Sequence, residues 1–388
     1  MKRLWAVLKW IVIVLAVLNV AIVVSGNFYL YTVFQHTIFK GRLGPAIDEY
    51  EIFANRDVPA PQPKAWPQGQ DYQQVAPSEA QIARMEELGT VAFLIIKDDS
   101  IRYERYWEKY GPKSHSNSFS MAKSIVSALI GVAIGEGHIQ NIDQPIGDFL
   151  PEYKEGKRAA ISIRHLLTMS SGIGFGESYI NPLSYPARAN YGTNLRELVY
   201  SYDVEYAPGE VFFYTSGNSQ LLAFVLEAAT GKRVSEYASE KLWGPMRAET
   251  PAMWSLDKEG GDEKAFCCFH SNARDFARMG QLYLNGGQWD GQQLVPADFV
   301  AESIQLAPLK ETDGSDQKRY GLHWWLLEHR GHEVFYMRGL AGQYVMVIPQ
   351  LRMLVVRLGH KREHGKGYAP PVDAIDWLDT ALDMYDDA

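Results

Sequence analysis

The chain is poor in cysteine. Its 388 residues include two, Cys267 and Cys268, and these are adjacent. Because neighbouring cysteines cannot join distant parts of a chain, a fold held together by a framework of disulfides is excluded. A zinc site built from four cysteines, or from a cluster of cysteines and histidines, is excluded as well, because the ligands are missing. We therefore expect no metal site.

Positive charge is also scarce. The 38 lysines and arginines are outnumbered by 46 aspartates and glutamates, which gives a formal net charge of −8, and no basic stripe interrupts this balance. Phosphate binding needs a basic face, so the composition argues against a nucleic-acid partner. The sequence also lacks the glycine-rich fingerprints of nucleotide-binding loops, and we expect no cofactor. A hydrophobic fraction of 46% and an aromatic fraction of 12% fit a folded globular protein.

The N-terminus carries a long uncharged run behind Lys2, Arg3 and Lys9. It covers Trp10–Gly26, and no charged side chain follows until Lys40. The length fits the roughly 20 apolar residues that span a bilayer better than the roughly 7–15 of a secretory signal. The positive flank predicts a cytoplasmic N-terminus, with the remainder outside, in a bacterial inner membrane facing the periplasm or at the cell surface. A cleaved signal peptide and a buried core helix are the alternatives.

Proline divides this N-terminal part from the rest. We predict a membrane helix over residues 1–26, a juxtamembrane and linker segment over 27–78, and a folded domain over 79–388. Residues 27–55 either follow the membrane or pack on the domain. Dense proline then disfavours helices and sheet ladders and indicates a semi-rigid spacer over Asn55–Ser78, where the prolines are Pro59, Pro61, Pro63, Pro67 and Pro77.

Strands are expected at both ends of the domain. Gly89–Trp107 is typical of a hairpin, and Arg319–Gly359 of four successive strands. The apolar segment Ser120–Gly137 predicts a buried helix, residues from about 140 to 310 are mostly helical, and Val372–Tyr385 predicts a final helix. This order implies an α/β (α+β) fold, with one antiparallel sheet built from both termini of the domain and an inserted helical region.

The start of the buried helix carries a serine and a lysine three residues apart, Ser120 and Lys123. This spacing places both side chains on one helix face. A serine hydroxyl needs an adjacent base to become a nucleophile, and a lysine serves as that base when burial destabilises its ammonium form. The helix N-terminus adds N–H groups that favour a developing oxyanion. An N-cap serine with a surface lysine is the structural alternative.

Two further segments carry groups suited to the same chemistry. Tyr214 follows a Pro-Gly loop and precedes Ser216, so its hydroxyl is placed to relay protons. Near the C-terminus, Arg338-Gly339-Leu340 lies between two strands, where glycine permits close backbone approach to a substrate. A half-buried tyrosine and a simple hairpin turn are the structural alternatives. The loop Phe175–Tyr191 is a candidate lid over such a site.

Taken in this order, the segments resemble the serine β-lactamase-like family, which includes class C β-lactamases, D,D-peptidases, family VIII esterases and 6-aminohexanoate-dimer hydrolases. The resemblance covers Glu79–Tyr385 and implies a serine β-lactamase/transpeptidase-like fold. The sequences that carry it, besides the S-x-x-K, Y-x-S-G-N and G-L-A-G-Q motifs, are ISIRHLLTMSSGI, LLAFVLEAATGKRVSEYASEKLWGPM and NARDFARMGQLYLNGG. The LLTMSSG, Y-x-S-G-N and G-L-A-G-Q forms look closest to the 6-aminohexanoate-dimer hydrolase branch.

The resemblance implies a role for each matching residue. Ser120 would be the acylated nucleophile, Lys123 its general base and Tyr214 the proton relay. The backbone N–H groups of Ser120 and Leu340 would form the oxyanion hole. Substrate-binding positions would be Ser216, Arg338 and Gly339.

Two departures from the β-lactamase pattern stand out. Ser216 replaces the asparagine of Y-x-N, and Met337-Arg338-Gly339 replaces K-T-G. Arg338 either faces a substrate carboxylate or points into solvent. We expect a serine hydrolase acting on a small amide or ester, peptide-like substrates included. The rivals are a catalytically weak penicillin-binding or peptidoglycan-recognising sensor, and a true β-lactamase or D,D-peptidase. The oligomeric state does not follow from the sequence.

Overall fold

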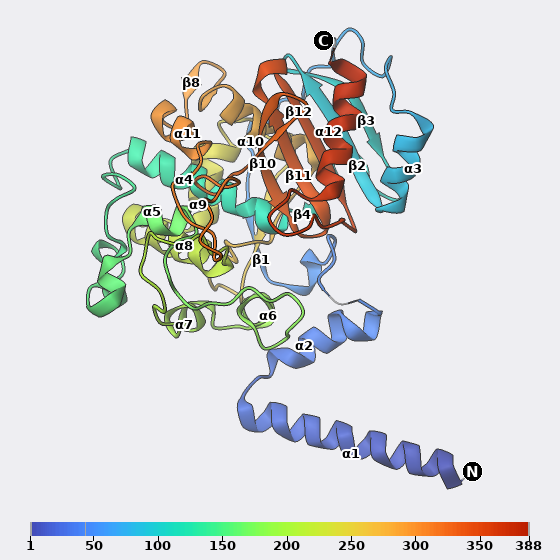
Figure 1. Cartoon of the computed structure of the whole chain (residues 1–388), viewed down its shortest axis with the longest axis vertical. Helices are drawn as coiled ribbons and strands as arrows, with labels where there is room; N and C mark the ends of the chain where they lie inside the picture. The colour runs from blue at the N-terminus through green and yellow to red at the C-terminus, as the bar shows by residue number, and fades with distance from the viewer. Residues whose placement is uncertain (1, 43, 387–388) are drawn as a thin grey trace.

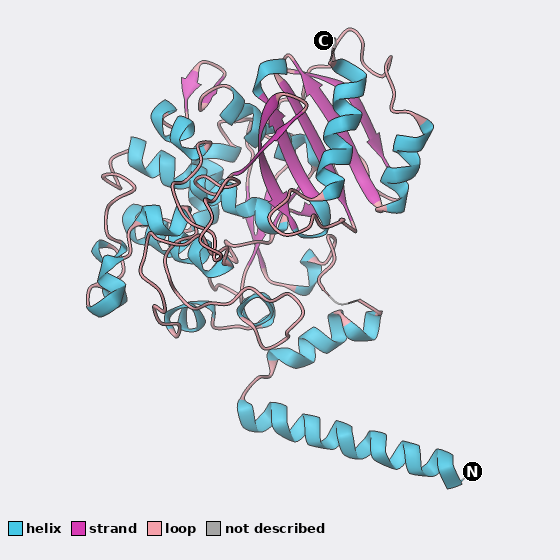
Figure 2. Ribbon diagram, viewed as in Figure 1, coloured by secondary structure: helices cyan, strands magenta, loops and turns pink. Residues whose placement is uncertain are grey.

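A six-stranded antiparallel sheet forms one side of the domain in the computed structural model, which describes residues 2–42 and 44–386 (Figures 1 and 2). Its strand order, β3-β2-β12-β11-β10-β9, places the first and last strands of the domain side by side. The predicted sheet from both termini is therefore confirmed. The strands are β2 (Thr90–Lys97), β3 (Ser100–Tyr106), β9 (Trp325–His329), β10 (His332–Gly339), β11 (Gln343–Ile348) and β12 (Met353–Gly359).

Both faces of the sheet are covered by helices, which explains the continuous apolar sequence of its central strands. Helices α3 (Glu79–Glu87) and α12 (Val372–Tyr385) cover one face (Figure 1). Helix α10 (Ala273–Leu284) packs on the other. Every residue of β12 is buried, as expected for a strand covered on both sides. The first of the four predicted C-terminal strands begins later than expected, because residues 319–324 form a turn before β9, with His323 at φ 63°.

The inserted region is mostly helical, as predicted. Its helices pack around α4 (Ala122–Gly135), which precedes the insertion and is buried on all sides, so the apolar residues of α4 need no amphipathic pattern. A short second sheet, in the order β1-β5-β6-β4 with β1 at Asn55–Val58, was not anticipated. The other elements are β4 (Ser116–Asn117), α5 (Ile163–Leu167), α6 (Tyr185–Tyr191), α7 (Leu195–Tyr200), α8 (Ser216–Thr230), α9 (Val234–Ala238), β5 (Ala252–Ser255), β6 (Phe269–Ser271), and α11 (Ala297–Ser303), besides the hairpin of β7 (Gln288–Trp289) with β8 (Gln292–Gln293).

Helix α1 (Lys2–Ser25) stands away from the body of the domain (Figure 1). In the described part of the chain, its Arg3–Ser25 segment is the one helix long and apolar enough to cross a membrane. Almost all of it is exposed, so the alternative of a buried core helix is wrong. Helix α2 (Tyr29–His36) follows after a short turn and packs against α6.

The predicted spacer over Asn55–Ser78 lies against the domain instead. Asn55–Val58 forms strand β1 and pairs antiparallel with β5. The Trp66 side chain is buried, and its indole N–H donates to the carbonyl oxygen of Arg274 at 2.8 Å. The prediction of a semi-rigid spacer without sheet pairing was wrong, because the prolines follow β1 and so do not interrupt its pairing with β5. The remaining boundaries, 1–26 and 79–388, stay predictions.

Candidate active site

Ser120 lies in a tight turn at the entry to α4. The preceding residue, Phe119, has a positive φ of 43°, a strained conformation for a bulky side chain. The amide of Phe119 donates to Asn117 Oδ1 at 2.8 Å, which helps to hold this turn. The strain therefore occurs where the chain must present the Ser120 hydroxyl, which is half-exposed, at the start of a buried helix.

Lys123 lies one turn further along and is 1% exposed. Its Nζ lies 3.2 Å from Ser120 Oγ and 3.2 Å from Ser216 Oγ, and it donates to the Phe266 carbonyl oxygen at 2.7 Å. Burial lowers the pKa of Lys123 to about 8, although the charge of Glu177 acts in the opposite direction. At pH 7, about a tenth of the molecules therefore hold this amine neutral.

Tyr214 faces the same two residues. Lys123 Nζ lies 5.3 Å from the centre of its ring, and the ring packs against Trp325 at 5.4 Å. Burial raises the pKa of Tyr214, and a hydrogen bond with Ser120 opposes that rise. The phenol therefore keeps its proton at neutral pH.

The turn after β10 reaches Ser120 because position 339 is glycine. A Cβ at Gly339 would overlap the carbonyl oxygen of Ser118. Leu340 follows, and Ala341 has a positive φ of 59°. The buried guanidinium of Arg357 donates to the carbonyl oxygens of Ala341 at 3.0 Å and Gly342 at 2.8 Å, and so holds this turn. The predicted oxyanion-hole segments thus meet.

Ser216 begins α8, and its side chain is buried between Lys123 and a carboxylate that the sequence analysis missed. Glu177 accepts from the Ser216 amide at 2.8 Å and from Ser216 Oγ at 2.5 Å. It also accepts from the Tyr179 hydroxyl at 2.6 Å. Both residues come from the predicted lid loop, Phe175–Tyr191. The loop therefore contacts the site, but no motif in it could have singled out Glu177.

Arg338 turns toward the cleft rather than into bulk solvent. Its guanidinium carbon lies 4.7 Å from the centre of the Trp325 ring, on the side where Trp325 meets Tyr214. Arg362 lies near enough that the Arg338 charge lowers its pKa, after burial as the main cause. Neither arginine forms an ion pair with an acidic side chain in residues 2–42 and 44–386. Burial raises the pKa of Tyr214, and the charges of both arginines act against that rise.

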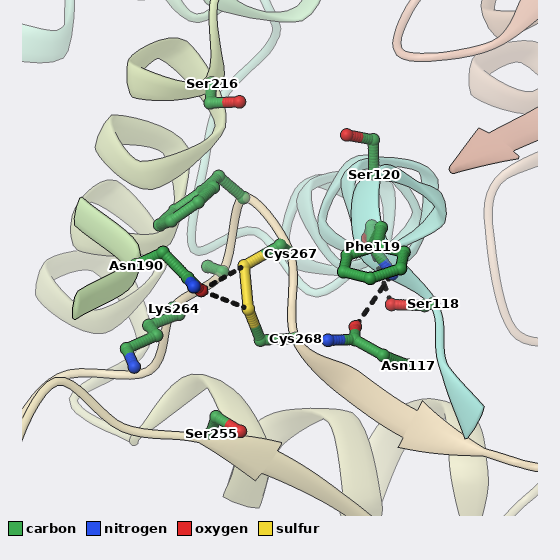
Figure 3. Close-up of a disulfide and its surroundings, with 12 residues drawn as sticks. Asn117, Ser118, Phe119, Ser120, Asn190, Ser216, Ser255, Lys264, Cys267 and Cys268 are labelled. Atoms are coloured by element: carbon green, nitrogen blue, oxygen red, sulfur yellow. Dashed lines mark hydrogen bonds between the residues drawn. A yellow bond between two sulfur atoms is a disulfide. The ribbon is translucent and has the colours of Figure 1, made fainter. Parts of the chain in front are cut away.

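Cys267 and Cys268 are joined in a vicinal disulfide (Figure 3), and Cys267 lines the same pocket as Ser120. Asn190 Oδ1 contacts both sulfur atoms, at 4.0 Å and 3.4 Å respectively. Figure 3 also shows the hydroxyls of Ser120 and Ser216 pointing toward one another. The disulfide follows directly on Phe266, whose carbonyl holds Lys123. Sequence reasoning excluded a stapling role for these cysteines and did not anticipate this local ring.

A pocket of about 160 Å³ opens beside Ser120. Its inner end is formed by Phe119, Ser120 and Leu340, and its outer wall comes from α2, the turn after it and the lid loop. Tyr214 and Arg338 are not among the described residues that line it. The described residues also include no group of three histidine, cysteine or acidic side chains placed to hold a metal ion.

Comparison with known proteins identifies a family. The family model for Beta-lactamase matches residues 79–374. The chain belongs to this family. The 6-aminohexanoate-dimer hydrolase of Paenarthrobacter ureafaciens is 27% identical over 296 residues, which cover 71% of this chain and 74% of that protein. The resemblance to the serine β-lactamase-like family and its 6-aminohexanoate-dimer hydrolase branch is therefore confirmed.

Two solved structures share the fold. A Bacillus anthracis homologue of 6-aminohexanoate-dimer hydrolases superposes with a TM-score of 0.72 at 22% identity, covering 88% of this chain and 92% of that one. A D-stereospecific amidohydrolase from Streptomyces gives a TM-score of 0.58 at 16% identity, over 74% and 95% of the two chains. The β-lactamase/transpeptidase-like fold is therefore confirmed, and the relatives include amide hydrolases.

Proposed function

We propose that this protein is a serine hydrolase that cleaves an amide or ester through a covalent acyl-enzyme on Ser120. The observation that carries the proposal is the contact of 3.2 Å between Lys123 Nζ and Ser120 Oγ, made by an amine that is 1% exposed. A surface lysine or a capping serine would need neither the burial nor the contact. Because a binding protein has no use for a depressed lysine pKa, this pair favours an enzyme over the sensor alternative.

In the proposed reaction, neutral Lys123 accepts the proton of Ser120 while Oγ attacks the substrate carbonyl. The backbone N–H groups of Ser120 and Leu340 stabilise the oxyanion. Tyr214 then donates a proton to the departing amine or alcohol and recovers one from Lys123. Water attacks the acyl-enzyme in the second half, and Ser120 regains its proton. No metal or cofactor is needed for these steps.

The substrate positions follow from the same geometry. Ser216 and Gly339 would border the scissile bond, since one touches Lys123 and the other borders the oxyanion turn. Arg338 lies on the Tyr214 side, where the leaving group departs, so it would hold an anionic group there. The relatives support an amide or ester of the type cleaved by the 6-aminohexanoate-dimer hydrolase branch.

The proposed location is a membrane, with the domain outside the cytoplasm. Helix α1 supports the anchor, and Arg3 and Lys9 at its N-terminal end support a cytoplasmic N-terminus. A disulfide also persists better in an oxidising compartment. A reporter enzyme that is active only in the periplasm, fused after Ala388, should be active. Activity of a cytoplasm-only reporter at the same position would contradict this orientation.

Substrate comparison tests the proposed activity. We expect Ser120-dependent hydrolysis of p-nitrophenyl butyrate with a kcat/KM far above that for nitrocefin, because Y-x-S replaces Y-x-N and Met337 replaces the lysine of K-T-G. Ser120→Ala should abolish the esterase activity. Nitrocefin hydrolysis near the diffusion limit with negligible esterase activity would restore the β-lactamase alternative. Ligand binding without turnover of esters, amides or D-alanyl-D-alanine peptides would favour the sensor.

A further inference from the structure

The pocket beside Ser120 lies on the acyl side of the site. In the proposed function, on which this inference rests, the leaving group departs past Tyr214. Tyr214, Trp325 and Arg338 cluster on that side, whereas the pocket extends from Ser120 in another direction, toward α2. A substrate bound across Ser120 must therefore place its acyl part in the pocket.

The walls of this pocket are predominantly apolar. Val33 and Ile38 contribute from α2 and the turn that follows it, and Ile180, Pro186 and Tyr191 contribute from the lid loop and α6. Its polar lining residues are all uncharged, among them Ser120, Ser178 and Asn181. Such a surface gains free energy from a methylene chain and offers no counter-charge to a charged or polar acyl group.

The apolar lining continues to the outer surface. Ile38 and Ile180 line the pocket, yet they are 53% and 93% exposed. Phe39, next to Ile38, is 81% exposed. Soluble surfaces seldom carry such large apolar groups together, and a cluster at a pocket mouth marks contact with a membrane or a partner.

The position of α2 favours contact with a membrane over contact with a partner protein. Three residues separate the end of α1 at Ser25 from the start of α2 at Tyr29. It lies between α1 and the body of the domain (Figure 1). Phe28, directly before α2, is 58% exposed, and Tyr31, within α2, is 40% exposed. Exposed aromatic side chains are typical of the bilayer interface. The Tyr29 hydroxyl donates to the Pro182 carbonyl oxygen at 3.0 Å, so α2 is tied to the lid loop.

We propose that the substrate is an amphiphile with a long acyl chain, and that the chain enters the α2 pocket from the membrane surface. The amide or ester carbonyl lies at Ser120, and the polar leaving group lies beside Tyr214 and Arg338. Helix α2 thus combines two tasks, one wall of the acyl pocket and attachment to the membrane helix. The acyl chain is transferred to Ser120 Oγ and then to water, which releases a fatty acid.

A chain-length series on the full protein in detergent tests the pocket. Among p-nitrophenyl esters from acetate to laurate, we expect kcat/KM to rise at least tenfold from butyrate to laurate. Ile180→Ser, a change at an exposed position that leaves the fold intact, should lower the laurate-to-butyrate ratio at least fivefold. Ala187→Phe, which fills the pocket wall, should lower it further. Leu306→Ser, at a half-exposed leucine outside this pocket, is the matched control and should keep the wild-type ratio.

The outcomes separate this inference from the proposed function. Ser120-dependent hydrolysis with no preference for laurate, or a ratio unchanged in Ile180→Ser and Ala187→Phe, would overturn the acyl pocket and leave the hydrolase standing. Hydrolysis that survives Ser120→Ala would overturn the proposed function itself.

A vesicle experiment tests the source of the chain. The full protein in phosphatidylcholine vesicles is supplied with a long-chain ester either in the same vesicles or in separate ones. We expect at least tenfold faster hydrolysis when enzyme and ester share a bilayer. Equal rates would contradict delivery from the membrane and identify a water-borne acyl donor instead.

Discussion

The two walls of the cleft are built differently. The catalytic wall, defined by Ser120, Lys123, Tyr214 and Phe266, is densely hydrogen-bonded and rests on the buried helix α4. The acyl wall, formed by α2 and the lid loop, is apolar and partly exposed. Burial within the catalytic wall lowers the pKa of Lys123, and the contacts of this wall orient the Ser120 hydroxyl. The acyl wall offers only an apolar surface. In the proposed function, the reaction type would therefore reside in a few buried contacts, whereas we propose that substrate choice resides in apolar groups that face a membrane.

The largest expected effect comes from a substitution that prevents residue 123 from becoming neutral. Lys123→Arg keeps the positive charge but cannot deprotonate at neutral pH. We expect kcat/KM for p-nitrophenyl butyrate to fall at least about 10³-fold, close to the loss in Ser120→Ala. Lys113→Arg, at an exposed lysine, is the control and should remain active. Near-normal turnover by Lys123→Arg would exclude the general-base role.

Removing the Tyr214 hydroxyl should impair protonation of the leaving group while leaving proton transfer from Ser120 to Lys123 in place. Tyr214→Phe keeps the ring against Trp325 and Tyr320. A departing amine needs a proton, whereas p-nitrophenolate leaves without one, so we expect a loss of about 10² on a butyryl anilide and a much smaller loss on the ester. Tyr320→Phe, at the neighbouring buried ring, should affect both substrates alike. Equal losses for Tyr214→Phe on both substrates would contradict proton donation.

The pH dependence of activity tests the effect of Glu177, in the lid loop, on the pKa of Lys123. Protonated Lys123 cannot accept a proton, so activity should fall as the pH drops through its pKa of about 8. We expect kcat/KM for the ester to rise about tenfold from pH 7 to pH 9. Because the charge of Glu177 raises the pKa of Lys123, Glu177→Gln should move this limb to lower pH. A limb that stays in place would contradict the coupling.

The smallest expected effect concerns the vicinal disulfide. Reduction frees the backbone after Phe266, whose carbonyl oxygen holds Lys123 at 2.7 Å. We expect dithiothreitol to lower kcat/KM by roughly two- to fivefold, well below the loss of about 10² that a 1 Å displacement of a reacting group causes. The Cys267→Ser/Cys268→Ser variant should show the lowered rate with and without reductant. Equal sensitivity of that variant to reductant would refute the explanation.

Much of the catalytic wall could be predicted from the sequence, and little of the acyl wall. The Ser120–Lys123 spacing fixes a shared helix face through local geometry alone, and the apolar runs of the C-terminal strands impose the sheet. Glu177 reaches the site through a long loop whose path depends on tertiary packing, so no local pattern identifies it. Likewise, the prolines after β1 suggested a spacer because strand pairing with distant β5 leaves no local signal. The positions of Glu177 and of β1 both depend on contacts between segments far apart in the sequence, which local patterns do not reveal.

Labelling with a fluorophosphonate tests the central claim most directly. The probe reacts with an activated serine and adds one phosphonyl group, which peptide mass spectrometry can locate. We expect stoichiometric modification of Ser120 in the full chain, no labelling in Ser120→Ala and strongly slowed labelling in Lys123→Arg. Modification of a different serine, or an unlabelled protein that still hydrolyses esters, would contradict an acyl-enzyme on Ser120 activated by Lys123.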